Sequence, residues 1–172
     1  VDKEYYKLGG GALQNRALGN GGVTIIGLDD DSSTNVFSNN KSNKNGGAIH
    51  ARAENNGDVG SVTINGTTTF VGNQAGEQGG AISNMPLLGQ STFTFHGNVS
   101  FQNNIAGGDG GASYNNGNMT FNGDVTFSGN KSGATFTFDE DTNVITGYTG
   151  GVANDIYNNG TITFGGDVTL DG

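Results

Sequence analysis

The sequence lacks cysteine altogether and contains a single proline, Pro86. The missing cysteine excludes disulfide bonds, thiolate chemistry and cysteine-ligated zinc. Although 33 of the 172 residues are glycine, glycine does not recur at every third position, so a collagen-like triple helix is excluded as well. Apolar residues make up 32% of the chain and fall in regular alternating runs, which favours a folded protein over a disordered one.

Positive charge is also scarce. Seven Lys and Arg residues stand against 16 Asp and Glu, for a formal net charge of -9. Phosphate groups are bound by clusters of basic side chains, so we expect neither nucleic acid nor an anionic membrane surface as a partner. No apolar run approaches the roughly 18 residues of a membrane span, so we expect this segment not to be embedded in a membrane.

What the chain does contain is a repeat. A Gly-Gly-Ala element occurs four times, and its glycine pairs are Gly10-Gly11, Gly46-Gly47, Gly79-Gly80 and Gly110-Gly111. A variant of the element is Gly150-Gly151-Val152. Short runs with a central Thr follow, at Thr24, Thr63, Thr94, Thr120 and Thr163. A second run then ends in an aromatic residue with Asn three positions later, in the pairs Phe37 and Asn40, Phe70 and Asn73, Phe101 and Asn104, Phe127 and Asn130. Leu170 takes the aromatic position in the last copy.

The spacing of these elements predicts an all-β fold. Phe is followed by the next Gly-Gly after nine residues in three copies, and apolar residues alternate with polar ones around Thr120 and Thr126. We predict a single domain over residues 1–172: a right-handed parallel β-helix, or β-solenoid, of about five coils starting near residues 10, 46, 79, 110 and 150. Loops lengthen the corners after residues 28, 50 and 84, and residues 135–148 are predicted to form a β-hairpin insertion.

Each recurring residue type has a predicted structural role. The glycines permit positive φ and close backbone approach. The four Asn residues are predicted to occupy left-handed turn positions and to form an amide ladder, and the four Phe residues to stack from coil to coil. The central Thr residues are predicted to form one outward-facing rank, which would suit an ice-binding surface, but Thr is also an ordinary strand residue.

Residues that could carry chemistry are few. Many β-helices are carbohydrate-active enzymes, and His50, Arg52 and Glu54 in one predicted insertion are the best candidates, with solvated loop residues as the simpler interpretation. We therefore predict no catalytic residue and no enzymatic activity. Calcium is the one cofactor considered, with Asp29, Asp31, Asp139 and Asp141 as candidate ligands, although none of these runs has an EF-hand spacing.

The paired elements resemble a known family. GGAL at Gly10, GGAI at Gly46 and Gly79, and FSNN, FVGN, FQNN and FSGN at the four Phe positions look like the passenger repeats of the chlamydial polymorphic membrane proteins and similar autotransporter-type proteins. The resemblance implies a non-enzymatic β-helical passenger at the bacterial cell surface or outside the cell. Its implied role is adhesive or structural, with a receptor or glycan on a host cell or neighbouring cell as partner.

The two ends of the chain suggest an alternative. Residues 171–172 and 1–9 together nearly complete one repeat interval. The chain could therefore be a fibre subunit that binds itself head to tail through Val1, Tyr5, Tyr6, Leu8 and Leu170. Any cut through a repeat array would give matching ends as well, so a fragment of a longer passenger remains the other interpretation.

Overall fold

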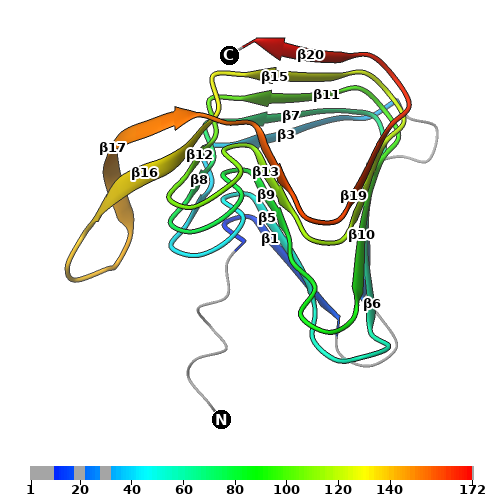
Figure 1. The fold of residues 1–172 in the computed structure, drawn as a ribbon, viewed down its shortest axis with the longest axis horizontal. Coiled ribbons are helices and arrows are strands. Elements are labelled where there is room, and N and C mark those ends of the chain that lie inside the picture. The colour runs from blue at the N-terminus through cyan, green and yellow to red at the C-terminus, as the bar shows by residue number, and fades with distance from the viewer. Residues whose placement is uncertain (1–9, 18–21, 28–31, 172) are drawn as a thin grey trace.

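The computed structural model describes residues 10–17, 22–27 and 32–171. Twenty β-strands are formed in these ranges, arranged in four five-stranded sheets that surround the core (Figure 1). Among the described residues, no helix is long and apolar enough to cross a membrane.

The first four coils each contribute one strand to each sheet, the fifth contributes β18, β19 and β20 to sheets A, B and C, and β17 joins sheet D as the antiparallel partner of β16. Sheet A contains β1 (Leu13–Ala17), β5 (Ile49–Ala53), β9 (Ile82–Asn84), β13 (Ser113–Asn115) and β18 (Ile156–Asn158). Sheet B contains β2 (Gly22–Ile26), β6 (Val59–Ile64), β10 (Gln90–Phe95), β14 (Asn118–Phe121) and β19 (Thr161–Phe164). Sheet C contains β3 (Thr34–Ser38), β7 (Thr67–Val71), β11 (Val99–Gln102), β15 (Val125–Ser128) and β20 (Val168–Asp171). Sheet D contains β4 (Lys41–Ser42), β8 (Gln74–Ala75), β12 (Ile105–Ala106), β16 (Lys131–Phe138) and β17 (Ile145–Ala153).

Equivalent strands of successive coils pair in parallel. In sheet C, Phe37 pairs with Phe70, Phe70 with Phe101, and Phe101 with Phe127. Nearly constant sequence intervals produce this register, because each coil must return to the same corner before the next begins. The prediction of an all-β parallel solenoid of about five coils is confirmed.

Aromatic rings fill the core. The sheet C rings stack with centroids 4.8 Å apart for Phe37 and Phe70, 5.0 Å for Phe70 and Phe101, and 5.1 Å for Phe101 and Phe127. Sheet B supplies a second stack, Phe95 on Phe121 at 4.8 Å, whose rings meet the first stack edge to face. Offset and edge-to-face aromatic contacts add about 0.5–1.5 kcal/mol each beyond the area they bury.

A ladder of buried amides runs beside the Phe stack. Asn40 Nδ2 donates to Asn73 Oδ1 at 3.0 Å, Asn73 Nδ2 to Asn104 Oδ1 at 2.9 Å, and Asn104 Nδ2 to Asn130 Oδ1 at 3.0 Å. The ladder ends where Asn130 Nδ2 donates to Asp155 Oδ1 at 2.8 Å. Each interior amide therefore satisfies polar groups of the coils on both sides, as buried polar groups require.

The ladder residues themselves are not in the left-handed region, so that part of the prediction is wrong. Positive φ falls one position earlier, at Asn39 and Asn103 with φ of 54° and 53°, and at Gly72 and Gly129 with φ of 65° and 62°. The residue before the ladder Asn turns the corner, which is why only Gly or Asn occupies it. This turn leaves the following side chain directed along the coil stack.

The two glycines of Gly-Gly-Ala act differently. Gly46, Gly79 and Gly110 have φ of 62°, 69° and 70°. The second glycine lies against the next coil: a Cβ on Gly80 would lie 2.0 Å from the carbonyl oxygen of Gly111. The first glycine thus makes the turn and the second permits backbone contact.

The fifth copy does not begin where the sequence predicted. Gly150 and Gly151 lie inside β17, whereas the backbone of Ala112 bonds to Asp155 and that of Gly111 to Asn154. Asn154 and Asp155 therefore occupy the turn of the fifth coil. The Gly-Gly-Val sequence was misleading because glycine can serve a kink in a hairpin as well as a coil corner.

The first copy is also shifted by one residue. Thr24 pairs with Val62 and Ile25 with Thr63, so Ile25, 61% exposed, takes the outward position predicted for Thr24. Two interactions favour this register: Asn15 Nδ2 donates to the Thr24 hydroxyl at 3.0 Å, and Ile26 packs against the core. The predicted rank of five outward Thr residues is therefore wrong at its first member.

Candidate functional site

The hairpin of β16 and β17 is the one described insertion that leaves the coil. Its strands pair antiparallel from Lys131 opposite Ala153 to Phe138 opposite Ile145, a wider range than residues 135–148. Figure 1 shows the hairpin projecting away from the stacked coils. We call residues 134–150, the part beyond the first two residue pairs, the arm.

Three glycines redirect the hairpin at the base of the arm. Gly133, Gly150 and Gly151 have φ of 71°, 70° and 91°. Gly133 and Gly150 have no atom within 4 Å of a built Cβ, so positive φ rather than crowding explains glycine there. The hairpin base can thus stay in sheet D while the arm turns toward the first coil.

The tip of the arm contacts coil 1. Lys41 Nζ donates to the carbonyl oxygen of Ile145 at 2.9 Å, and Asn43 Nδ2 donates to that of Asn143. Between these two attachments lies a cleft of about 660 Å³, bordered by residues 41–44 on one side and by Phe138 and residues 142–145 on the other. The cleft combines two ammonium groups, amides and hydroxyls with an apolar wall.

The arm exposes an unusual amount of apolar surface. Phe138 is 37% exposed, Val144 50% and Tyr148 39%, and Val152 at the base is 68% exposed. Phe136 and Tyr148 form a tilted ring pair at 6.0 Å. By contrast, Phe70, Phe101 and Phe127 of the inner coils are fully buried, and the exposed aromatic residues of the repeat, Tyr157 and Phe164, lie in the last coil.

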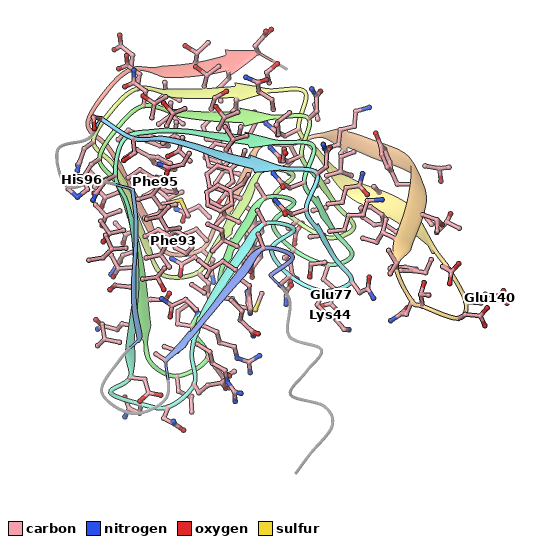
Figure 2. The ribbon with its side chains drawn as sticks, turned by 180° about the vertical axis from the view of Figure 1, so that it is seen from behind. Lys44, Glu77, Phe93, Phe95, His96 and Glu140 are labelled. Atoms are coloured by element: carbon pink, nitrogen blue, oxygen red, sulfur yellow. The ribbon has the colours of Figure 1, made fainter. Side chains whose placement is uncertain are left out.

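The acidic tip is a tight turn. Asp139 Oδ1 accepts hydrogen bonds from the Thr142 hydroxyl at 2.7 Å, from the Thr142 amide at 2.8 Å and from the Asp141 amide at 3.2 Å. These bonds, that from the Thr142 side chain foremost, hold the pKa of Asp139 below its ordinary value. Glu140 lies at the far end of the hairpin in Figure 2.

Calcium is the one cofactor that the sequence suggests. The described residues contain no group of three or more acidic or His side chains placed around one point. One carboxylate oxygen of Asp139 is already bonded within its own turn. Asp29 and Asp31 lie outside the described residues.

The candidate catalytic residues His50, Arg52 and Glu54 lie in and directly after β5. His50 and Arg52 belong to β5 rather than to an insertion, which corrects that prediction. Glu54 Oε1 lies 2.8 Å from Arg16 Nε and 3.0 Å from Arg52 Nε. A carboxylate held by two guanidinium groups is poorly placed to act as a general base.

His50 is fully buried. Burial lowers the pKa of His50 to about 4, with a further contribution from the Arg52 guanidinium, and a weak interaction with the Ser83 backbone opposes the shift. Neither ring nitrogen has a partner in good hydrogen-bonding geometry among the described residues. The imidazole is therefore neutral and sealed from solvent.

A second amide ladder in sheet A was not predicted. Asn84 Nδ2 donates to Asn115 Oδ1 at 2.7 Å, and Asn115 Nδ2 to Asn158 Oδ1 at 2.8 Å. A signal existed, because Asn84 and Asn115 each lie five residues after the first glycine of a Gly-Gly-Ala element. Outside this ladder Tyr114 stacks on Tyr157 at 4.9 Å, and burial foremost raises the pKa of Tyr114.

Most residues predicted for self-assembly are not described. Val1, Tyr5, Tyr6 and Leu8 lie outside the described residues, whereas Leu170 in β20 is 67% exposed. At the arm's corner, Lys44 Nζ lies 2.5 Å from Glu77 Oε1, and Figure 2 labels the two side chains together.

These features define a class of protein: a β-solenoid held by Phe and Asn stacks, with one projecting arm. Three segments, residues 36–52, 67–85 and 94–112, match the Chlamydia polymorphic membrane protein repeat. The predicted resemblance to these repeats is therefore confirmed across the three segments. Members of the family are surface proteins of the autotransporter type and generally not enzymes. Neither the curated proteins nor the solved structures include a significant match to the chain.

Proposed function

We propose that this chain is an adhesive passenger displayed outside a bacterial cell, and that the arm and the cleft beneath it make the contact with a host or neighbouring cell. The observation that carries the proposal is the division of labour between repeat and arm. Phe70, Phe101 and Asn104 of the repeat are fully buried, whereas the arm exposes Phe138 and Tyr148.

The solenoid supplies a rigid support for such a contact. Its stacked rings and amides are fixed in both directions along the coil axis, at Asn73 and Asn104 for example. Binding residues are commonly placed on insertions that a rigid scaffold positions. Exposed apolar surface rimmed by polar groups is also typical of interaction sites.

The lining of the cleft limits the kind of partner. Lys44 is paired with Glu77, Lys41 binds a backbone carbonyl oxygen, and Asp139, Glu140 and Asp141 lie at the tip, so the surroundings carry no excess of positive charge. A polyanion is therefore not favoured. Amides, hydroxyls and an apolar wall suit a neutral glycan or a polypeptide.

The test removes the arm and keeps the solenoid. Deleting residues 134–150 joins Gly133 to Gly151, whose φ values of 71° and 91° are those that a two-residue type I′ turn needs at both central positions. We expect the variant to fold and to bind whole cells at least tenfold more weakly than the full-length chain. Both proteins are labelled and their binding to the same cells is measured.

A matched control changes exposed apolar residues elsewhere. Leu87 and Leu88, 58% and 65% exposed, lie in the loop between β9 and β10. Replacing both with Ser should leave cell binding unchanged. Full binding by the arm deletion, or loss of binding by the Leu87→Ser, Leu88→Ser variant alone, would contradict the proposal.

A further inference from the structure

We propose that the outer edge of β17 in the arm binds an extended segment of a partner protein by β-strand addition. This inference rests on the proposed adhesive function and specifies the chemistry of its partner. The segment concerned is residues 146–149, between the Ile145 carbonyl that binds Lys41 and the glycine kink.

The edge of β17 has no strand partner among the described residues. In sheet D the order is β17, β16, β12, β8 and β4, so β17 is terminal and pairs only with β16. The coil-type strands of this sheet, β4, β8 and β12, are two residues long. A further coil strand of two residues would pair with β17 only at the hairpin base near Ala153. The edge of β17 within the arm would stay unpaired.

The edge also lacks the features that usually protect such strands. Natural edge strands are blunted by charged residues, proline or shortness, because their free N–H and C=O groups template another strand. β17 spans nine residues and contains no charged residue and no proline. Within the arm, Thr146, Tyr148 and Thr149 are all exposed.

The chemistry of the edge selects its occupant. Alternating donors and acceptors at strand spacing are satisfied by another extended backbone, which is how strand-adding domains gain affinity. A glycan cannot reproduce that alternation. The partner segment is therefore a polypeptide of about four residues.

Side chains and charge define the partner segment further. On one face of the arm it would lie beside Tyr148, whose ring pairs with that of Phe136, and apolar or β-branched residues pair well with an aromatic residue there. On the other face it meets Gly147 and Thr149. Asp139, Glu140 and Asp141 precede the strand, so a basic residue at the end nearest the tip complements the edge.

A synthetic probe tests the proposal on the full 172-residue chain. The probe is a seven-residue peptide of alternating Thr and Val with Lys at each end, and the comparison peptide has Pro at its centre. We expect the Thr-Val peptide to slow amide hydrogen exchange at least tenfold at outward-facing amides of residues 146–149. The Pro peptide should have no effect.

Two proline substitutions locate the contact. Amides of neighbouring strand residues point to opposite edges, so of Gly147→Pro and Tyr148→Pro one removes an outward donor and the other breaks pairing with β16. We expect the substitution that removes an outward donor to keep the arm folded, as judged by hydrogen exchange of the β16 amides. That variant should bind the Thr-Val peptide at least tenfold more weakly.

Three results would overturn strand addition. They are protection of the β17 edge in the free protein, peptide binding that survives both substitutions, and binding of a neutral glycan at the arm with no response to the peptide. The proposed function would survive each of them if deletion of residues 134–150 still abolished cell binding, so the two failures are distinguishable.

Discussion

The side chain of Asn104 joins three coils. Its Oδ1 accepts from the amide nitrogen and Nδ2 of Asn73, and its Nδ2 donates to Asn130 and to the carbonyl oxygen of Phe70. None of these groups can turn to water instead, because Asn73 and Asn104 are fully buried. The side chain is thus bound by its neighbours on both sides.

Replacing Asn104 with Ala should therefore be costly. Each buried polar group left without a partner costs about 1–3 kcal/mol, so we expect a loss of about 3 kcal/mol or more in the free energy of unfolding. Asn40→Ala is the matched control: Asn40 is only half-buried and bonds to Asn73 alone in the ladder, so about 1 kcal/mol is expected. Urea unfolding measures both, and equal losses would refute the ladder account.

Glycine substitutions separate close contact from flexibility. Gly80→Ala would place a Cβ 2.0 Å from a backbone oxygen of the next coil, and backbone on both sides cannot retreat without breaking pairs. Gly147→Ala in the arm meets nothing within 4 Å. Thermal unfolding should show a loss of several °C for Gly80→Ala and almost none for Gly147→Ala. An unchanged unfolding temperature for Gly80→Ala would contradict the role of Gly80 in the backbone contact between coils.

At the scale of strands and stacks, position along the solenoid should decide the effect of a mutation. Phe101 is fully buried between Phe70 and Phe127, whereas Phe37 has a stacked ring on one side only among the described residues. Phe101→Leu should lower the free energy of unfolding by about 1–3 kcal/mol and Phe37→Leu by clearly less, because stacking contacts are lost on two sides and one side respectively. Chemical unfolding of the two variants tests this, and a larger effect at Phe37 would contradict it.

Fixed sequence intervals explain why the strands of the middle coils could be predicted. From Phe70 and Phe101 to the next Gly-Gly the distance is constant, so sheet C register follows directly. The first coil was harder, since Val23-Thr24-Ile25-Ile26 has apolar residues that fit either face. The Asn15 hydrogen bond and the packing of Ile26 against the core, which the residue pattern of the strand does not reveal, favour the observed face.

The candidate site was less predictable than the coils. A hairpin could be inferred from the alternation around residues 135–138, but its kink depends on the left-handed glycines 133, 150 and 151. The docking of the arm on Lys41 joins residues 104 positions apart. No local sequence pattern encodes a contact of that range.

For the molecule as a whole, His50 should make stability depend on pH. Its pKa is about 4 when folded against 6.5 when unfolded, so between these values the unfolded chain binds the extra proton. Stability should therefore fall as pH drops from 6.5 to 4, by at most about 1.4 kcal/mol per pH unit.

The control for this prediction removes the titrating group. A His50→Leu variant should show a flatter pH dependence of the free energy of unfolding over the same interval, with carboxylate titration common to both proteins. Parallel curves for the two proteins would mean that His50 is not the source.

The end of the amide ladder bears on how such a protein can acquire new parts. Every amide from Asn40 to Asn130 passes a donor to the next coil, but Asp155 receives one and has no side-chain N–H to pass on. A coil that follows Asp155 therefore needs no side-chain acceptor at the ladder position. The hairpin enters the chain between Asn130 and Asp155, at the one place in the described ladder where extra residues interrupt no amide-to-amide bond. A lineage of such repeats could gain, lose or exchange arms there while the shaft stayed unchanged.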